Sequence, residues 1–328
     1  MRFARPLAPR RVPAAQCPER AVSNTSGSRR KIGALLAVVS VAFWALLPVV
    51  SKGLLDTVDA YTLNFYRFVM ASLILSVYSL AKSGAPLATA RTRWHYAIFG
   101  VAVAGLLLNH ILFMDALQYI PAGASQIIAQ LGPIGLLLVS VLFLGEPFTR
   151  RQWLGTLVFT AGLLLFFEQK LGEILAASSA YAGGVLYMSL ASLIWIFYGL
   201  GQKLLVAVFS PVHILLSVYA VGALVLLPVS EVAIILELDG VKLGLLVASC
   251  LTSLIAYICF GESVSRWDAS KSSALLAVIP LITLLYENLL GLLLPAHIEP
   301  DALTITTTAG AVVVVIGCLT VTRGRQSP

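Results

Sequence analysis

Ten apolar runs follow one another along this chain, and each is close to the length of a helix that crosses a membrane. A bilayer core about 30 Å thick requires about 20 residues of α-helix. The chain is 59% hydrophobic and only 11% charged, whereas soluble domains carry about 25% charged residues. Because only a bilayer accommodates so much apolar surface, we predict an all-α integral membrane protein of ten transmembrane helices. The predicted spans are 32–54, 60–81, 95–117, 121–144, 152–169, 182–202, 212–230, 241–263, 272–294 and 302–322.

The second half of the chain repeats the first. The shared residues are Gly33/Gly184, Trp44/Trp195 and Lys52/Lys203 at a spacing of 151, and Asp115/Glu262, Ala122/Ala269, Ser125/Ser272 and Pro133/Pro280 at a spacing of 147. We place the first repeat at 32–169 and the second at 182–322. Five spans per half is an odd number, so the second half enters the membrane from the other side. The sequence therefore predicts two inverted five-helix repeats, an arrangement found in secondary transporters.

The positions of the charges predict the orientation of these spans. If the N-terminus lies in the cytoplasm, 18 of the 22 Lys and Arg residues fall on the cytoplasmic side, as the positive-inside rule requires. The basic residues that produce the net charge of +7 then lie along the inner membrane face, and we expect no nucleic-acid partner. Residues 1–31 hold eight basic residues and four prolines, which predicts a disordered cytoplasmic arm. We expect a multi-pass protein of a bacterial inner membrane, with residues 323–328 as a cytoplasmic tail.

Several of these residues also resemble a known family. The stretch from Gly33 to Trp44, followed by Arg67 in the sequence FYRF, resembles the opening of an EamA-type repeat of the drug/metabolite transporter superfamily. The likeness continues through residues 115–165, which include Pro133, and it covers both halves, about 32–322. It is looser in the second half, where Leu292-Leu293 replaces a Gly-Glu pair. The resemblance implies a ten-helix metabolite transporter fold and names no substrate, because fold alone does not settle function.

No motif of an enzyme is found in the sequence. P-loop, GxSxG and HExxH patterns and paired catalytic carboxylates are all missing. The four cysteines form no CxxC pair, and so we predict no metal site. We therefore expect no catalytic residue and no cofactor, and transport that draws on a gradient.

Polar side chains within the spans are the candidate site, because they are costly in hydrocarbon and usually face a pathway. We predict that Arg67 binds an anionic group of the substrate, with Glu287 as its counter-charge or as a proton-coupling site. The alternative is a structural ion pair between these two residues. The amide side chains expected around the same cavity are those of Asn109, Gln126 and Gln130.

Aromatic residues are expected to shape this cavity. Trp44 and Trp195 are repeat-equivalent and lie near the middle of the membrane, where we predict cavity walls, with plain packing as the alternative. Tyr198 and Tyr286 are further candidates for substrate binding. Pro133 and Pro280 are expected to bend the fourth and ninth spans at the cavity, because proline removes a backbone hydrogen bond.

Three further ionisable residues have two interpretations each. His110 is either a packing residue or a proton relay that titrates near neutral pH. Asp115 and Glu262 occupy equivalent positions on opposite membrane faces, and they are either solvated acids or a pair of gates that act alternately.

The function predicted from the sequence is secondary transport of a small organic metabolite by alternating access. Amino acids or similar amphiphiles are the leading substrate class, and export is expected by analogy with the family. The alternatives are a proton-coupled exporter of lipophilic cations and an exchanger of nucleotide sugars or phosphate esters. The expected partners are a small-molecule substrate and membrane lipids, and a homodimer stays open.

Overall fold

The computed structural model describes residues 19–81, 92–144, 149–176, 179–205, 209, 211–266, 275–298 and 304–323. Within these ranges the secondary structure is helical, with no strand, and this confirms the predicted fold class. The α-helices are α1 (Glu19–Lys52), α2 (Ala60–Ala81), α3 (Arg93–Tyr119), α4 (Ala122–Ala129), α5 (Leu131–Leu144), α6 (Arg150–Phe166), α7 (Leu171–Ala176), α8 (Ala180–Leu205), α9 (Pro211–Leu226), α10 (Gly240–Arg266), α12 (Ile279–Leu293) and α13 (Ile305–Arg323). Short 3₁₀ turns lie at Glu168–Lys170, Leu227–Val229 and Val232–Leu236.

The helices have the length and surface of membrane spans. Six in the described part of the chain are long and apolar enough to cross a bilayer, namely α1, α2, α3, α8, α9 and α10, and α12 and α13 are shorter apolar helices. Large apolar side chains such as Leu224, Leu292 and Ile305 are exposed on the outside of the bundle. Against lipid tails this exposure carries no penalty, because the surrounding medium is itself apolar.

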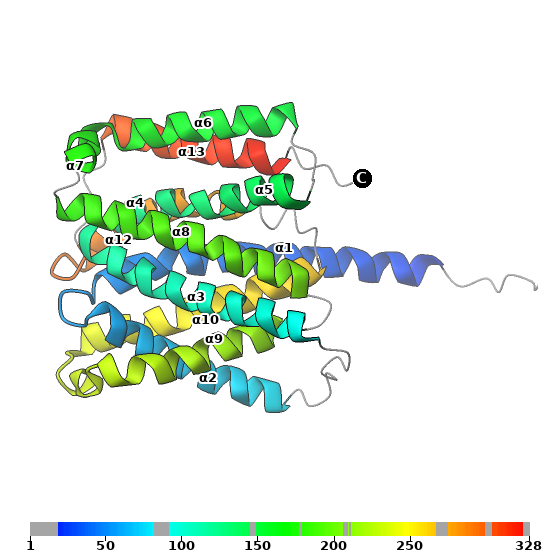
Figure 1. The fold of residues 1–328 in the computed structure, drawn as a ribbon, viewed down its shortest axis with the longest axis horizontal. Coiled ribbons are helices and arrows are strands. Elements are labelled where there is room, and N and C mark those ends of the chain that lie inside the picture. Colours follow the sequence, from blue (N-terminus) through cyan, green and yellow to red (C-terminus); the bar gives the residue numbers. More distant parts are fainter. Residues whose placement is uncertain are drawn as a thin grey trace, which may run out of the picture.

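The helices pack in pairs that the repeat relates (Figure 1). The fifth spans of the two halves, α6 and α13, lie side by side at one edge of the bundle, and the second spans, α2 and α9, lie together at the opposite edge. The first span of each half contacts the third span of the other half, α1 with α10 and α8 with α3. This pairing is what a two-fold relation between the halves produces.

Glycines allow the α6–α13 pair to approach closely. A Cβ added at Gly155 would lie 2.7 Å from the backbone nitrogen of Val321, and one at Gly162 would lie 2.5 Å from that of Val314. Gly310 and Gly317 face α6 in the same way, against the backbone of Phe166 and Phe159. Small residues at such positions let the helix backbones pack closely. This van der Waals packing stabilises the helix pair in a membrane, where no hydrophobic driving force acts between helices.

The fourth span is broken at its centre, as its proline predicts. α4 ends at Ala129 and α5 begins at Leu131, with Gln130 between them. Pro133 has no N–H for the carbonyl of Ala129, so a continuous ladder is impossible here. Pro280 is the second residue of α12, and a turn at residues 277–278 precedes that helix. Both predicted bends are confirmed, and both fall near the middle of the bundle.

The first helix is longer than the span predicted to begin at residue 32. α1 begins at Glu19, directly after Pro18, the last proline of the N-terminal region. Residues 19–31, predicted as part of the disordered arm, extend the first helix instead, because they contain no proline to interrupt it. Residues 1–18 of the predicted arm, and 324–328 of the predicted tail, lie outside the described residues.

Candidate functional site

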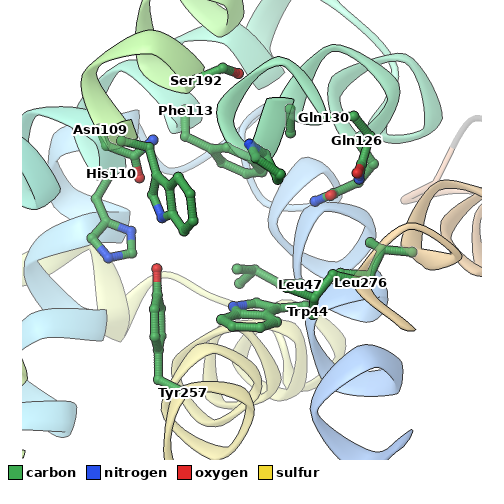
Figure 2. Close-up of a pocket in the computed structure, with 14 residues that line it drawn as sticks. Trp44, Leu47, Asn109, His110, Phe113, Gln126, Gln130, Ser192, Tyr257 and Leu276 are labelled. Carbon is green, nitrogen blue, oxygen red and sulfur yellow. The ribbon is translucent and has the colours of Figure 1, made fainter. Parts of the chain in front are cut away.

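A cavity of about 140 Å³ lies at the centre of the bundle, beside the break between α4 and α5 (Figure 2). Its walls come from both halves of the chain and are mostly apolar and aromatic. The lining residues are Trp44, Leu47, Asn109, His110, Phe113, Gln126, Ala129, Gln130, Pro133, Ser192, Trp195, Tyr257, Leu276 and Ile279.

Three pairs of repeat-equivalent residues are found among these side chains. Trp44 and Trp195 are 151 residues apart, while His110/Tyr257 and Ala129/Leu276 are each 147 residues apart. Each half of the chain therefore contributes the same kind of wall. The cavity lies where the two repeats meet.

Aromatic rings pack closely around the cavity. The rings of Trp44 and Tyr257 meet edge to face, with centroids 5.0 Å apart and an interplanar angle of 86°. Tyr257 also lies beside His110, at 6.1 Å between ring centroids, and Figure 2 shows both on one side of the cavity. Trp195 also lines the cavity and packs against Tyr198, at 6.3 Å between ring centroids. Rings from both halves of the chain therefore meet around the cavity.

Amide and hydroxyl groups supply the polar part of the wall. The Asn109 Nδ2 donates to the carbonyl of Ala191 at 2.9 Å, and the Gln130 Oε1 accepts from the Cys318 Sγ at 3.7 Å. Each amide has further donor or acceptor capacity beyond these single bonds. Gln126 and Gln130 lie across the cavity from His110 (Figure 2).

Arg67 is buried and is linked to the cavity wall through Asn64. Its side chain is 1% exposed, and its Nη1 donates to the Asn64 Oδ1 at 2.8 Å. Asn64 in turn donates to the backbone carbonyl of His110 at 3.1 Å. Arg67 is not among the lining residues, but it lies within electrostatic reach of His110 and Tyr257.

Glu287 has a different position from the one expected. Its carboxylate is 1% exposed and accepts hydrogen bonds from the backbone N–H groups of Ala122 at 3.0 Å and Gly123 at 2.9 Å. It therefore caps the N-terminus of α4, where the preceding Pro121 provides no side-chain cap. In the described part of the chain, the expected ion pair between Arg67 and Glu287 is not formed.

Six of the predicted site residues meet at the cavity, and six do not. Those that line it are Trp44, Asn109, His110, Gln126, Gln130 and Trp195. The proton-relay role of His110 and substrate binding by the other five stay predictions. Arg67 and Glu287 lie outside the lining, as do Tyr198 in one apolar cluster and Tyr286 against another.

Asp115 and Glu262 also lie away from the cavity, towards opposite ends of the bundle. Asp115 accepts a hydrogen bond from the Gln118 Nε2 at 3.2 Å, and Glu262 forms an ion pair with Arg266 at 2.7 Å. These contacts join each acid to its own helix. Their predicted gating role remains a prediction.

Tyr257 is a lining residue that the sequence analysis missed, together with Phe113 and Ser192. The duplication contained the signal for Tyr257, because it is the repeat mate of His110 at the same spacing of 147 that relates Asp115 to Glu262. The structure makes this pair visible because both members reach the cavity.

One end of the bundle, where α1 and α3 terminate, is tied together by polar contacts. The Lys52 ammonium of α1 donates to the backbone carbonyls of Leu117 and Gln118, which suits the negative end of α3. Lys242 forms an ion pair with Asp56 at 3.0 Å. We call this region the Lys52 end.

Asp239 also lies at the Lys52 end, just before α10. The backbone N–H of Lys242 donates to this carboxylate at 2.8 Å and, as the largest cause, holds its pKa below the ordinary value. His297 lies 3.9 Å away. Here too the contacts link neighbouring segments of the bundle.

The described residues contain no group of three or more His, Cys, Asp or Glu side chains that could hold a metal ion. The central cavity offers aromatic rings, amides and one imidazole, which suit noncovalent binding of a small molecule. Fold and cavity together define a class, that of multi-pass membrane proteins in which two related halves enclose a central cavity.

Comparisons with known proteins give the family. The model of the EamA-like transporter family matches residues 31–168 and 182–323. The chain therefore belongs to the EamA-like transporter family of the drug/metabolite transporter superfamily, as the sequence predicts, and family and relatives indicate a transporter rather than an enzyme.

Individual relatives agree with this assignment. The chain is 35% identical over 289 residues to the uncharacterized inner membrane transporter YhbE of Escherichia coli K12. The aligned region covers 88% of this chain and 90% of that protein. The chain is 24% identical over 306 residues to the pseudopaline exporter CntI of Pseudomonas aeruginosa UCBPP-PA14, covering 90% and 98%. A solved crystal structure has the same fold, with a TM-score of 0.63 at 17% identity, over 89% of this chain and 97% of that one.

Proposed function

We propose that this protein is a secondary transporter that carries a small organic amphiphile through the central cavity by alternating access. The observation that carries this proposal is the lining of the cavity by repeat-equivalent pairs, Trp44/Trp195 and His110/Tyr257. When two inverted repeats exchange conformations, a site between them opens first to one side of the membrane and then to the other.

The size and chemistry of the cavity favour a small substrate with an apolar body. An apolar cavity of about 150 Å³ holds a molecule the size of benzene, and the cavity here measures about 140 Å³. Trp44, Trp195 and Phe113 suit an apolar or aromatic group, while Asn109 and Gln126 suit hydrogen-bonding groups. An amino acid or a related amphiphile satisfies both conditions.

We infer export as the direction and place both termini in the cytoplasm. The positive-inside distribution of the Lys and Arg residues supports this orientation. A relative that covers 90% of this chain is named an exporter, which supports export. The Lys52 end of the bundle then faces the outside.

The two alternative substrate classes fit the site less well. Lipophilic cations would meet the positive field of Arg67, and the acid expected to bind them, Glu287, already accepts two backbone hydrogen bonds. Nucleotide sugars and phosphate esters require several basic groups, and the described cavity lining contains neither Lys nor Arg.

Counterflow in proteoliposomes tests the proposal. Purified protein is reconstituted with a panel of amino acids and organic amines inside, and entry of the matching labelled compound is measured. We expect a saturable signal for at least one compound, reduced at least tenfold in Trp44→Leu and in Trp195→Leu. The matched control is Trp94→Leu, because Trp94 is exposed on the bundle surface. Wild-type rates in both cavity variants would overturn the proposal.

A further inference from the structure

Three buried polar atoms on one side of the cavity have no hydrogen-bond partner among the described residues. They are the Arg67 Nε, the His110 Nε2 and the Tyr219 hydroxyl. His110 and Tyr219 lie close together, with ring centroids 6.1 Å apart, and Tyr219 is also among the groups that interact electrostatically with Arg67. Unsatisfied buried groups are rare and require an explanation, such as a bound ligand.

The charge of Arg67 is also uncompensated. The ionisable groups within electrostatic reach of this guanidinium include Tyr219, Cys250, Tyr257 and His110, and no carboxylate of the described part of the chain pairs with it. A buried charge without a partner is strongly unfavourable. Ionisable residues inside a membrane protein are kept where they serve a function.

The position of this cluster connects it to the substrate cavity. His110 is 5% exposed and lines the cavity together with Tyr257, and Asn64 links Arg67 to the backbone carbonyl of His110. Arg67 belongs to α2 and Tyr219 to α9, and these helices are the packed second spans of the two halves. The cluster therefore joins residues of both repeats, and His110 connects it to the cavity.

We propose that Arg67, His110 and Tyr219 form an anion site at this side of the cavity, and that its ligand is a carboxylate. Arg67 supplies the charge, while the imidazole and the hydroxyl donate hydrogen bonds to the carboxylate oxygens. Charge-assisted hydrogen bonds of this kind are the strong ones. The identity of the carboxylate rests on the proposed function, because it is a group of the transported molecule.

The side chains on the opposite side of the cavity indicate a second polar group of the substrate. Gln126 and Gln130 lie across from His110 (Figure 2), and their side-chain oxygens can accept hydrogen bonds from an ammonium group. A zwitterion with a small apolar side chain matches the cavity in three places. Its carboxylate suits the anion site, its ammonium suits the two glutamines, and its apolar group suits the aromatic walls. This makes α-amino acids the substrate class.

Binding to the full chain in detergent tests the anion site without any transport measurement. Because Trp44 and Trp195 line the cavity, tryptophan fluorescence and the melting temperature are the two readouts. The probes are L-leucine and L-phenylalanine, each paired with its carboxamide, together with sodium acetate and sodium chloride. We expect each acid to bind at least tenfold more tightly than its amide.

Two variants assign this preference to the cluster. Arg67→Met is expected to lose acid binding by about ten- to hundredfold and to bind acid and amide equally. Tyr219→Phe removes a hydroxyl that has no hydrogen-bond partner among the described residues, so we expect normal folding and a fall in acid binding of about tenfold. The matched control is Tyr187→Phe, whose ring lies on the exposed face of α8.

The remaining outcomes separate the source of the anion from the site itself. Binding of acetate or chloride alone, lost in both variants, supports the anion site with a solution anion as its ligand. Equal binding of acid and amide, or no binding of any probe, overturns it. If counterflow finds a substrate that Arg67→Met carries at the wild-type rate, the anion site is wrong and the transporter stands. Acid binding without counterflow of any compound overturns the transport proposal alone.

Discussion

Arg67 is the residue whose environment is most unusual in this protein. A guanidinium in a membrane protein interior is ordinarily paired with a carboxylate or placed in water. Here its described hydrogen bond is to the neutral side chain of Asn64, and Glu287 is engaged elsewhere. The two explanations of Arg67, a structural ion pair and a ligand site, predict effects of different size when it is removed from the ligand-free protein.

Replacing Arg67 with methionine is expected to change the stability of the ligand-free protein by no more than about 1 kcal/mol. The lost hydrogen bond to Asn64 contributes on this scale, and removal of a buried unpaired charge offsets it. A structural ion pair would instead lose about 3–5 kcal/mol. Thermal unfolding in a buffer free of small anions measures the difference, with Arg266→Met as a control for loss of a half-exposed ion pair. A large drop in melting temperature specific to Arg67→Met would contradict the ligand-site explanation.

Whether the sequence could predict a site residue depended on what determines the position of that residue. Trp44 and Trp195 could be placed because duplication and span depth are both visible in the sequence. The sequence could not show whether Arg67 and Glu287 contact each other, because their contacts depend on how α2, α4 and α12 pack. The Glu287 bonds to backbone N–H groups in particular leave no trace in the sequence, since any residue at position 122 or 123 except proline offers the same donor.

At the scale of the element, α4 is a short helix that depends on its neighbour. It is eight residues long, and its N-cap residue Pro121 makes no side-chain cap. Glu287 of α12 supplies the cap instead, where a negative charge also suits the positive end of the helix dipole. The close approach of α12 is possible because residue 123 is glycine, at which a Cβ would lie 2.9 Å from the Glu287 Oε2.

Glu287→Gln is expected to destabilise the protein by about 1–3 kcal/mol. The amide offers one acceptor oxygen where the carboxylate offers two, and its NH₂ group would face a backbone N–H. The measurement is the melting temperature in detergent at neutral pH. Glu168→Gln is the matched control, because that glutamate is exposed at the surface. An equal melting temperature in the two variants would show that the cap contributes nothing to stability.

The elements themselves were largely predictable, because the bilayer dictates their length and proline dictates where they break. Each predicted span contains a helix, and the fourth is divided next to Pro133. The start of α1 at Glu19 was not foreseen, since membrane thickness limits the apolar part of a helix and not its polar extension. Only local signals such as Pro18 act there.

At the scale of the whole molecule, the contacts at the Lys52 end belong to one of the two states that the proposed alternating access requires. They join α1 to α3 through Lys52, the start of α10 to the α1–α2 turn through Lys242, and α12 to α4 through Glu287. The repeat-related pairing of helices predicts a second state of similar packing in which this end is open. If the protein works by the proposed alternating access, these links form and break in each cycle.

A disulfide between α1 and α10 should hold the protein in the state described here. The hydroxyls of Ser51 and Ser249 lie 2.8 Å apart in the buried contact between these helices, which places the two side chains within reach of a cross-link. We expect Ser51→Cys/Ser249→Cys, made in a background with Cys250→Ala, to lose counterflow on oxidation and regain it on reduction. The single variants Ser51→Cys and Ser249→Cys should respond to neither treatment.

Substrate binding to the oxidised double variant distinguishes a locked carrier from a damaged one. In a locked carrier, ligand binding persists while counterflow is lost, because the cavity remains formed and only its exchange between the two sides is blocked. Full counterflow by a protein shown to be cross-linked would mean that α1 and α10 do not separate at Ser51 during transport. The moving boundary would then have to lie between other helices, with the α4–α12 contact at Glu287 as the next to be tested.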